Sequence, residues 1–82
     1  MNLAKINITL KDSVLDPQGQ TVLRTLKGMS ENEVHDVRVG KYVEMTLDAD
    51  SISSANSMAV RICEKLLVNS VIESYSLEIV TL

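Results

Sequence analysis

The chain has 82 residues, a formal net charge of −3 and a hydrophobic fraction of 45%, with one cysteine and one histidine. The acidic balance argues against a nucleic-acid partner, which would require a basic patch, and against binding to an anionic membrane surface. One cysteine excludes an internal disulfide, one histidine argues against a histidine-based metal site, and three scattered glycines form no phosphate loop. We therefore expect neither a cofactor nor a catalytic set on this chain.

The small size of the chain has two further consequences. No apolar run approaches the roughly 20 residues of a membrane helix, and no secretory leader is visible, so we expect one cytoplasmic domain over residues 1–82. A chain this short buries only about 60–65% of its unfolded surface. Because Phe and Trp are absent, the core must consist of Ile, Val, Leu and Met. Association with other chains is then the remaining route to a stable fold.

The chain begins with a pattern that predicts a strand over residues 3–11. Every second side chain is apolar, at Ala4, Ile6, Ile8 and Leu10, and the side chains between them are polar. This period of two is typical of a strand with one buried and one solvated face.

A helix is expected over residues 17–28. Asp16 can accept hydrogen bonds from the free amides of the first turn, and Pro17 fits the first helical position. Gly28, with Ser30 beyond it, marks the end of the helix. Apolar side chains recur at helical spacing, at Val22, Leu23, Leu26 and Met29.

Residues 34–48 allow two interpretations. Gly40 and Lys41 have the form of a two-residue hairpin turn. Such a turn would place Val37 opposite Glu44 and bring a charge onto the apolar face. A single strand keeps the odd-numbered apolar side chains in phase through Gly40, which would then be a bend or bulge. We prefer one long bent strand and keep the hairpin as the alternative.

The second half of the chain predicts a helix over residues 51–68, a left-handed cap at Asn69 and a final strand over residues 71–80. The order of elements is β-α-β-α-β. We expect an α+β fold with two amphipathic helices packed on one face of a mostly antiparallel sheet of three or four strands.

Two side chains invite a catalytic interpretation and have a simpler one. His35 beside Asp36 could act as a general base. Because no Ser or Cys nucleophile lies nearby in the sequence, we interpret it as a solvated strand residue. Cys63 falls on the apolar stripe of the second helix, which favours a buried structural thiol over a nucleophile.

Polar side chains on the long strand form the better candidate site. Arg38, Tyr42 and Glu44 share the face opposite its valines. Arg and Tyr are enriched at protein interfaces, because each covers apolar area and also supplies hydrogen-bond donors. A solvated sheet face would carry the same residue types, so the pattern alone leaves both interpretations open.

Four sequence blocks carry a resemblance to a known family. They are KDSVLDPQG at residues 11–19, VHDVRVGKY at residues 34–42, CEKLL at residues 63–67 and VIESY at residues 71–75. In this order they resemble the PurS family, the small subunit of phosphoribosylformylglycinamidine synthase. The resemblance covers nearly the whole chain.

The resemblance implies a function in purine synthesis. The holoenzyme converts formylglycinamide ribonucleotide to formylglycinamidine ribonucleotide. A large synthetase subunit performs the amidation, a glutaminase subunit releases ammonia, and these partners use the ATP, Mg²⁺ and glutamine. The small subunit bridges them, has no catalytic residues, and forms dimers or dimers of dimers.

We expect the residues that contact partner chains to lie in the first two blocks. They are Asp16, Pro17, Gln18, Arg38, Lys41, Tyr42 and Glu44. The alternative function is a small ferredoxin-like or ACT-like regulatory domain, which has the same element pattern and would bind a metabolite between subunits.

Overall fold

The computed structural model describes the whole chain from Met1 to Leu82 and contains three strands, two α-helices and one π-helical turn. The elements, in chain order, are β1 (Asn2–Leu10), α1 (Pro17–Gly28), β2 (Gly40–Leu47), α2 (Ile52–Ile62), η1 (Cys63–Leu67) and β3 (Glu73–Thr81). Neither helix is long and apolar enough to cross a membrane.

The three strands form one antiparallel sheet in the order β2-β1-β3. The central strand β1 carries the most deeply buried side chains of the sheet. Ala4, Ile6 and Ile8 are all at most 1% exposed. The predicted α+β class, the antiparallel sheet and the period-two pattern of β1 are confirmed.

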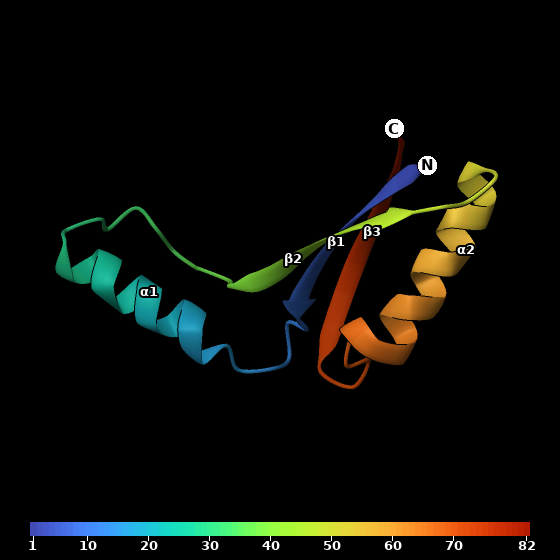
Figure 1. The fold of residues 1–82 in the computed structure, drawn as a ribbon. Helices are drawn as coiled ribbons and strands as arrows, with labels where there is room; N and C mark the ends of the chain where they lie inside the picture. Colours follow the sequence, from blue (N-terminus) through green and yellow to red (C-terminus); the bar gives the residue numbers. More distant parts are fainter.

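α2 covers one face of this sheet over β1 and β3 (Figure 1). Its buried small residues Ala55 and Ala59 let the helix approach Ala4 closely, and Cys63 packs with Ile6 and Ile8. Burial of an isoleucine side chain stabilises a fold by about 1.5–3 kcal/mol. We call the sheet together with α2 and η1 the lobe.

α1 takes a different position from the one expected. The sequence predicted both helices on one face of the sheet, but α1 extends away from the lobe and approaches the chain only near its N-terminal end (Figure 1). We call α1 and the irregular residues 29–39 the arm. The arm makes the molecule long, 51 × 27 × 14 Å, with a radius of gyration of 16.2 Å. A compact chain of this length would have about 12 Å.

The prediction of one long strand over residues 34–48 is wrong in its first part. β2 begins at Gly40, which pairs with Thr9 near the end of β1. Residues 34–39 are not in a strand, because no neighbouring strand of this chain takes their hydrogen bonds. The hairpin alternative is also wrong, because Gly40 and Lys41 both pair with β1. Val43, Met45 and Leu47 do face α2, as their phase predicted.

The end of the second helix also differs from the prediction. The last turn widens into η1, where the amide of Val68 donates to the carbonyl of Cys63 at 2.9 Å. Asn69 is not a left-handed cap, since Ser30 is the only residue with positive φ. Instead, its side-chain oxygen accepts from the amide of Val71 at 3.1 Å and forms a short turn into β3.

Candidate functional site

The carboxylate of Asp16 fixes the base of the arm. Its Oδ1 accepts from the amide of Gly19 at 3.0 Å, and its Oδ2 accepts from the amide of Val39 at 2.8 Å. One side chain therefore caps α1 and ties it to the segment before β2. The two backbone hydrogen bonds, that from Gly19 first, hold the pKa of Asp16 below its ordinary value.

Two neighbours make this connection tight. A side chain at Gly19 would collide with the carbonyl oxygen of Val37, so only glycine allows the close approach. The guanidinium of Arg38 donates to the carbonyls of Leu10 and Lys11, at 2.9 and 3.0 Å. Arg38 therefore closes the end of β1 within its own chain.

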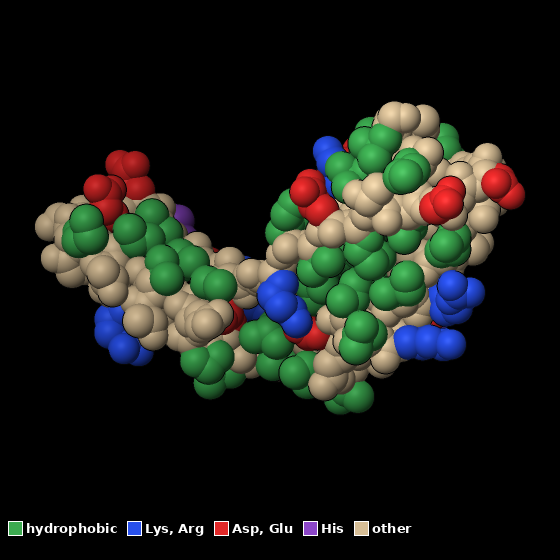
Figure 2. Space-filling model, viewed as in Figure 1, with side chains coloured by type: hydrophobic (Ala, Val, Ile, Leu, Met, Phe, Trp, Pro, Cys, Tyr) green, Lys and Arg blue, Asp and Glu red, His purple; other side chains and the backbone are tan.

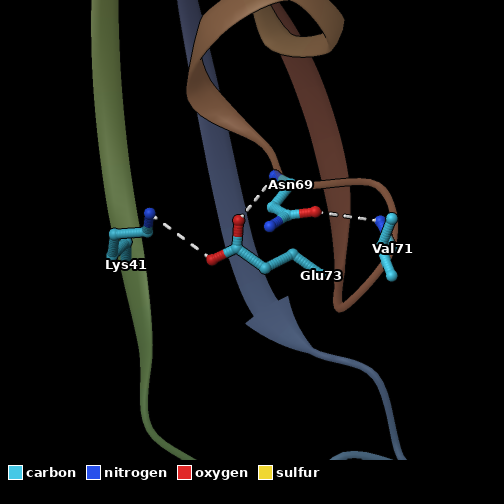
Figure 3. A network of polar contacts seen from close by, with 4 residues as sticks. All are labelled: Lys41, Asn69, Val71 and Glu73. Atoms are coloured by element: carbon cyan, nitrogen blue, oxygen red, sulfur yellow. Dashed lines mark hydrogen bonds and ion pairs between the residues drawn. The ribbon is translucent and has the colours of Figure 1, made fainter.

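A second polar cluster joins β2 to the start of β3. The ammonium of Lys41 lies 3.4 Å from one carboxylate oxygen of Glu73, and the other oxygen accepts from the amide of Asn69 at 2.7 Å (Figure 3). The backbone hydrogen bond, more than the nearby Lys41, lowers the pKa of Glu73. Because Lys41 is largely exposed, this ion pair adds little stability and leaves the ammonium accessible to a partner.

Tyr42 and Glu44 lie on the face of the sheet that α2 leaves uncovered. The Tyr42 hydroxyl donates to the Glu44 carboxylate at 2.9 Å, and the tyrosine is 53% exposed. Partial burial, followed by the hydrogen bond to Glu44, raises the pKa of Tyr42. Glu44 and Glu78 both pair in register with Lys5, which gives this face a central cation between two carboxylates.

The seven predicted site residues do not form one surface. Asp16, Pro17, Gln18 and Lys41 line the same shallow hollow of about 320 Å³ between the arm and the lobe. Tyr42 and Glu44 lie together on the uncovered face of the sheet. Arg38 was predicted to share that face, but it precedes β2, and its guanidinium is bound to carbonyls of the chain.

The two side chains with a possible catalytic interpretation have no catalytic surroundings. Cys63 is fully buried, and burial raises the pKa of its thiol, which disfavours the reactive thiolate. His35 is exposed within the arm. No three His, Cys, Asp or Glu side chains converge in a way that could hold a metal ion.

The sequence pattern did not reveal that the apolar stripe of α1 is uncovered. Val22 is 42% and Met29 is 66% exposed, and Leu23 and Leu26 are only partly buried. The stripe was interpreted as core because its spacing is that of a packed helix. The one available signal is the glycine in the first turn, which permits a close backbone approach, here to Val37.

A family model described as phosphoribosylformylglycinamidine (FGAM) synthase, PurS, matches residues 3–81 of this chain. The chain belongs to the PurS family. The PurS subunit of phosphoribosylformylglycinamidine synthase from Bacillus subtilis is 47% identical over 79 residues, covering 96% of this chain and 93% of the relative. The PurS subunit from Synechocystis is 42% identical over 78 residues, covering 95% of this chain and 78% of the relative.

Solved PurS structures share this fold. Methanocaldococcus jannaschii PurS, a subunit of formylglycinamide ribonucleotide amidotransferase, superposes with a TM-score of 0.92 at 29% identity, covering 100% of this chain and 99% of the other. A chain in the structure of PurLQS from Thermotoga maritima gives a TM-score of 0.84 at 32% identity, covering 98% of this chain and 100% of the other. Membership of this family and the α+β fold are therefore established for the chain.

Proposed function

We propose that this PurS-family chain is the non-catalytic assembly subunit of phosphoribosylformylglycinamidine synthase in purine biosynthesis. It bridges the ATP-dependent synthetase subunit and the glutaminase subunit, so that ammonia released at one site reaches the other. ATP, Mg²⁺ and glutamine are used by these partners and not by this chain. The complex works in the cytoplasm, because its phosphorylated substrate cannot diffuse across a membrane.

The observation that carries this proposal is the family match over residues 3–81. The Thermotoga maritima relative was solved as part of PurLQS, an assembly with other subunits. The chemistry of this chain agrees with a supporting role, since its single cysteine is buried and its single histidine has no nucleophile beside it. The family match favours an assembly subunit over the ferredoxin-like or ACT-like regulatory domain.

A bridge between two enzymes needs contact area and a fixed register. We propose that the chain supplies them as a homo-oligomer, a dimer or a dimer of dimers. Two exposed regions are available to contact the synthetase and glutaminase subunits. One is the uncovered sheet face around Tyr42 and Glu44, and the other is the rim of the hollow formed by Pro17, Gln18 and Lys41.

The assembly can be tested by sedimentation velocity of the purified chain with the synthetase and glutaminase subunits. We expect a complex larger than any pair only when all three proteins are present. The two large subunits alone should sediment separately. A complete complex that forms without this chain would contradict the proposal.

The uncovered sheet face can be tested in the same experiment. Tyr42→Ala should weaken the complex by about tenfold or more if it lies at the centre of an interface. Arg24→Ala, a matched change of a large exposed side chain on α1, should leave assembly unchanged. If Tyr42→Ala weakens the complex no more than Arg24→Ala does, the sheet face is not a partner surface.

A further inference from the structure

The two faces of the sheet carry different side chains. On the side of α2, hydrophobic side chains gather on the lobe between the arm and the helix (Figure 2). On the uncovered sheet face, Leu3, Val80 and the ring of Tyr42 are the apolar groups, and the other side chains are polar or charged. Tyr42 is 53% exposed there. A partner on the uncovered sheet face would therefore be held mainly through polar and charged groups.

A row of three charged side chains crosses the middle of the uncovered sheet face. Lys5 on the central strand β1 pairs in register with Glu44 on β2 and with Glu78 on β3. Side chains directly opposite one another on neighbouring strands share one face, with their Cβ atoms about 5 Å apart. Two carboxylates therefore flank one ammonium group, and one negative charge has no counterpart in the row.

The charged groups of this row form no ion pair with one another. The ion pair of the structure is the one between Lys41 and Glu73, so neither Glu44 nor Glu78 has a cation of the chain within ion-pair distance. The Tyr42 hydroxyl donates to one oxygen of Glu44 at 2.9 Å, which holds that carboxylate in place without neutralising it. Both carboxylates thus keep their charge available for a partner.

Negative charge also dominates the surroundings of the Tyr42 hydroxyl. Partial burial is the largest cause of the raised pKa of Tyr42, and the hydrogen bond to Glu44 and the charges of Glu44 and Glu78 add to it. All of these causes act in the same direction. A cation placed beside Tyr42 would be attracted by both carboxylates and by the face of the aromatic ring.

The charge pattern separates the possible occupants of the uncovered sheet face. One metal ion cannot bind both carboxylates, because β2 and β3 lie on either side of β1 and their backbones are about 10 Å apart. A second copy of the chain, stacked face to face, would bring two Lys5 ammonium groups against four carboxylates and leave two negative charges unpaired. A surface with several Arg or Lys side chains would compensate every carboxylate.

Of the two partners in the proposed function, the synthetase subunit is the one expected to carry such a surface. It uses ATP and a ribonucleotide, and proteins hold phosphate groups with Arg and Lys side chains. Glutamine, the substrate of the glutaminase subunit, has no phosphate group. An excess of cationic side chains is therefore expected on the synthetase subunit, where it would complement the carboxylates of the uncovered sheet face.

We propose that the uncovered sheet face binds a cationic surface of the synthetase subunit, with Glu44 and Glu78 each paired to an Arg or Lys side chain and Tyr42 packed beside them. This inference rests on the proposed function and names the partner and the chemistry of one of its two candidate surfaces. Because opposite charges steer such an association, its strength depends on ionic strength.

A photoreactive side chain identifies the partner directly. The chain carries p-benzoylphenylalanine in place of Tyr42 and is irradiated in a mixture with the synthetase and glutaminase subunits, and mass spectrometry identifies the cross-linked product. We expect the product to join this chain to the synthetase subunit. The same side chain in place of Arg24, which is exposed on α1, is the matched control and should give little of that product.

Three results of this experiment would overturn the inference. One is a product that joins the position of Tyr42 to the glutaminase subunit or to a second copy of this chain. Another is the absence of any product in a sample that sediments as the complete complex. The third is an equal yield of the synthetase product from the position of Arg24.

Removal of the two charges gives an independent measurement. Glu44→Gln combined with Glu78→Gln keeps the size of both side chains and should weaken binding in the three-protein complex about tenfold near 0.1 M salt. The difference from the native chain should shrink towards 1 M salt, because the Debye length falls from about 10 Å to about 3 Å. Glu64→Gln, a matched change of an exposed carboxylate in η1, should leave binding unchanged. No loss, or a loss that is the same at both salt concentrations, contradicts the inference.

Failure of this inference can be distinguished from failure of the bridging function. If the native chain forms no complex with the two large subunits, the bridging function and this inference both fall. If the complex forms and the doubly substituted chain binds as the native chain does, the inference alone falls.

Discussion

The lobe and the arm solve the problem of a small core in different ways. In the lobe, the central strand β1 contributes Ala4, Ile6 and Ile8 to two clusters that α2 and Cys63 seal from solvent. In the arm, α1 has an equally regular apolar stripe, but no helix or strand of the chain packs against it. The comparison teaches that helical periodicity predicts an apolar face without predicting whether the same chain covers it.

The largest expected effect is a loss of folding stability in the lobe. It should differ from a loss in the arm in its dependence on protein concentration. Ile6→Ala should lower the free energy of unfolding by about 3 kcal/mol, because Ile6 is fully buried and a cavity would remain. This loss should be the same at all concentrations. Leu26→Ala should have a cost that grows with concentration, because we propose that the chain self-associates and the stripe of α1 is available for that contact. Chemical denaturation at several protein concentrations makes the comparison, and a Leu26→Ala effect that is independent of concentration would contradict it.

The next prediction concerns the junction between arm and lobe. Gly19→Ala should destabilise the chain by about 2 kcal/mol, because the new methyl group collides with the backbone of Val37. Gly28→Ala is a matched control in the same helix, where no atom lies within 4 Å of the added carbon. It should be neutral or stabilising by up to about 0.5 kcal/mol. Thermal unfolding of both variants is sufficient, and an equal loss in the two would show that the junction is not tight.

A smaller effect should follow the ionisation of Asp16. Its pKa is lowered in the folded state, so its ionised form stabilises the fold above the unfolded pKa of about 3.9. This contribution is lost as the pH falls through the folded pKa. At neutral pH, Asp16→Asn should lower Tm by about 5 °C, because an asparagine side chain has one acceptor oxygen for the two amides of Gly19 and Val39. The difference in Tm from the native chain should shrink between pH 5 and pH 2, whereas a constant difference would show that the carboxylate does not titrate in this way.

The smallest effect is expected at the end of α1. Ser30 has a φ of 67° and is the only residue in the left-handed region. Glycine adopts this conformation without the steric cost of a side chain. Ser30→Gly should therefore raise the free energy of unfolding by about 0.5 kcal/mol if residue 30 keeps its conformation. A loss of stability by the same assay would indicate that the end of the arm rearranges on association.

The lobe was the more predictable region because its elements depend on local pattern. The alternation around Ile6 and the phase of Val43 and Met45 specified which side chains face α2. The cap of α1 was predictable as well, since Asp16 and Pro17 are a local signal. The second hydrogen bond of Asp16, to Val39, joins residues 23 positions apart and leaves no periodic trace in the sequence.

The predicted site residues lie on separate surfaces for a similar reason. Tyr42 and Glu44 lie together because they share the phase of one strand. Arg38 has the same phase but lies before the paired part of β2, where its guanidinium binds carbonyls at the end of β1. Strand phase is meaningful only where a neighbouring strand exists, and the sequence does not reveal where β1 ends relative to β2.

The central claim is that this chain acts through assembly and performs no chemistry itself. The most direct measurement is the rate of product formation by the synthetase and glutaminase subunits, with glutamine or free ammonia as the nitrogen source, with and without this chain. The account predicts that omitting the chain abolishes the glutamine-dependent rate and spares the ammonia-dependent rate. Full glutamine-dependent activity in its absence, or turnover by the chain alone, would contradict it.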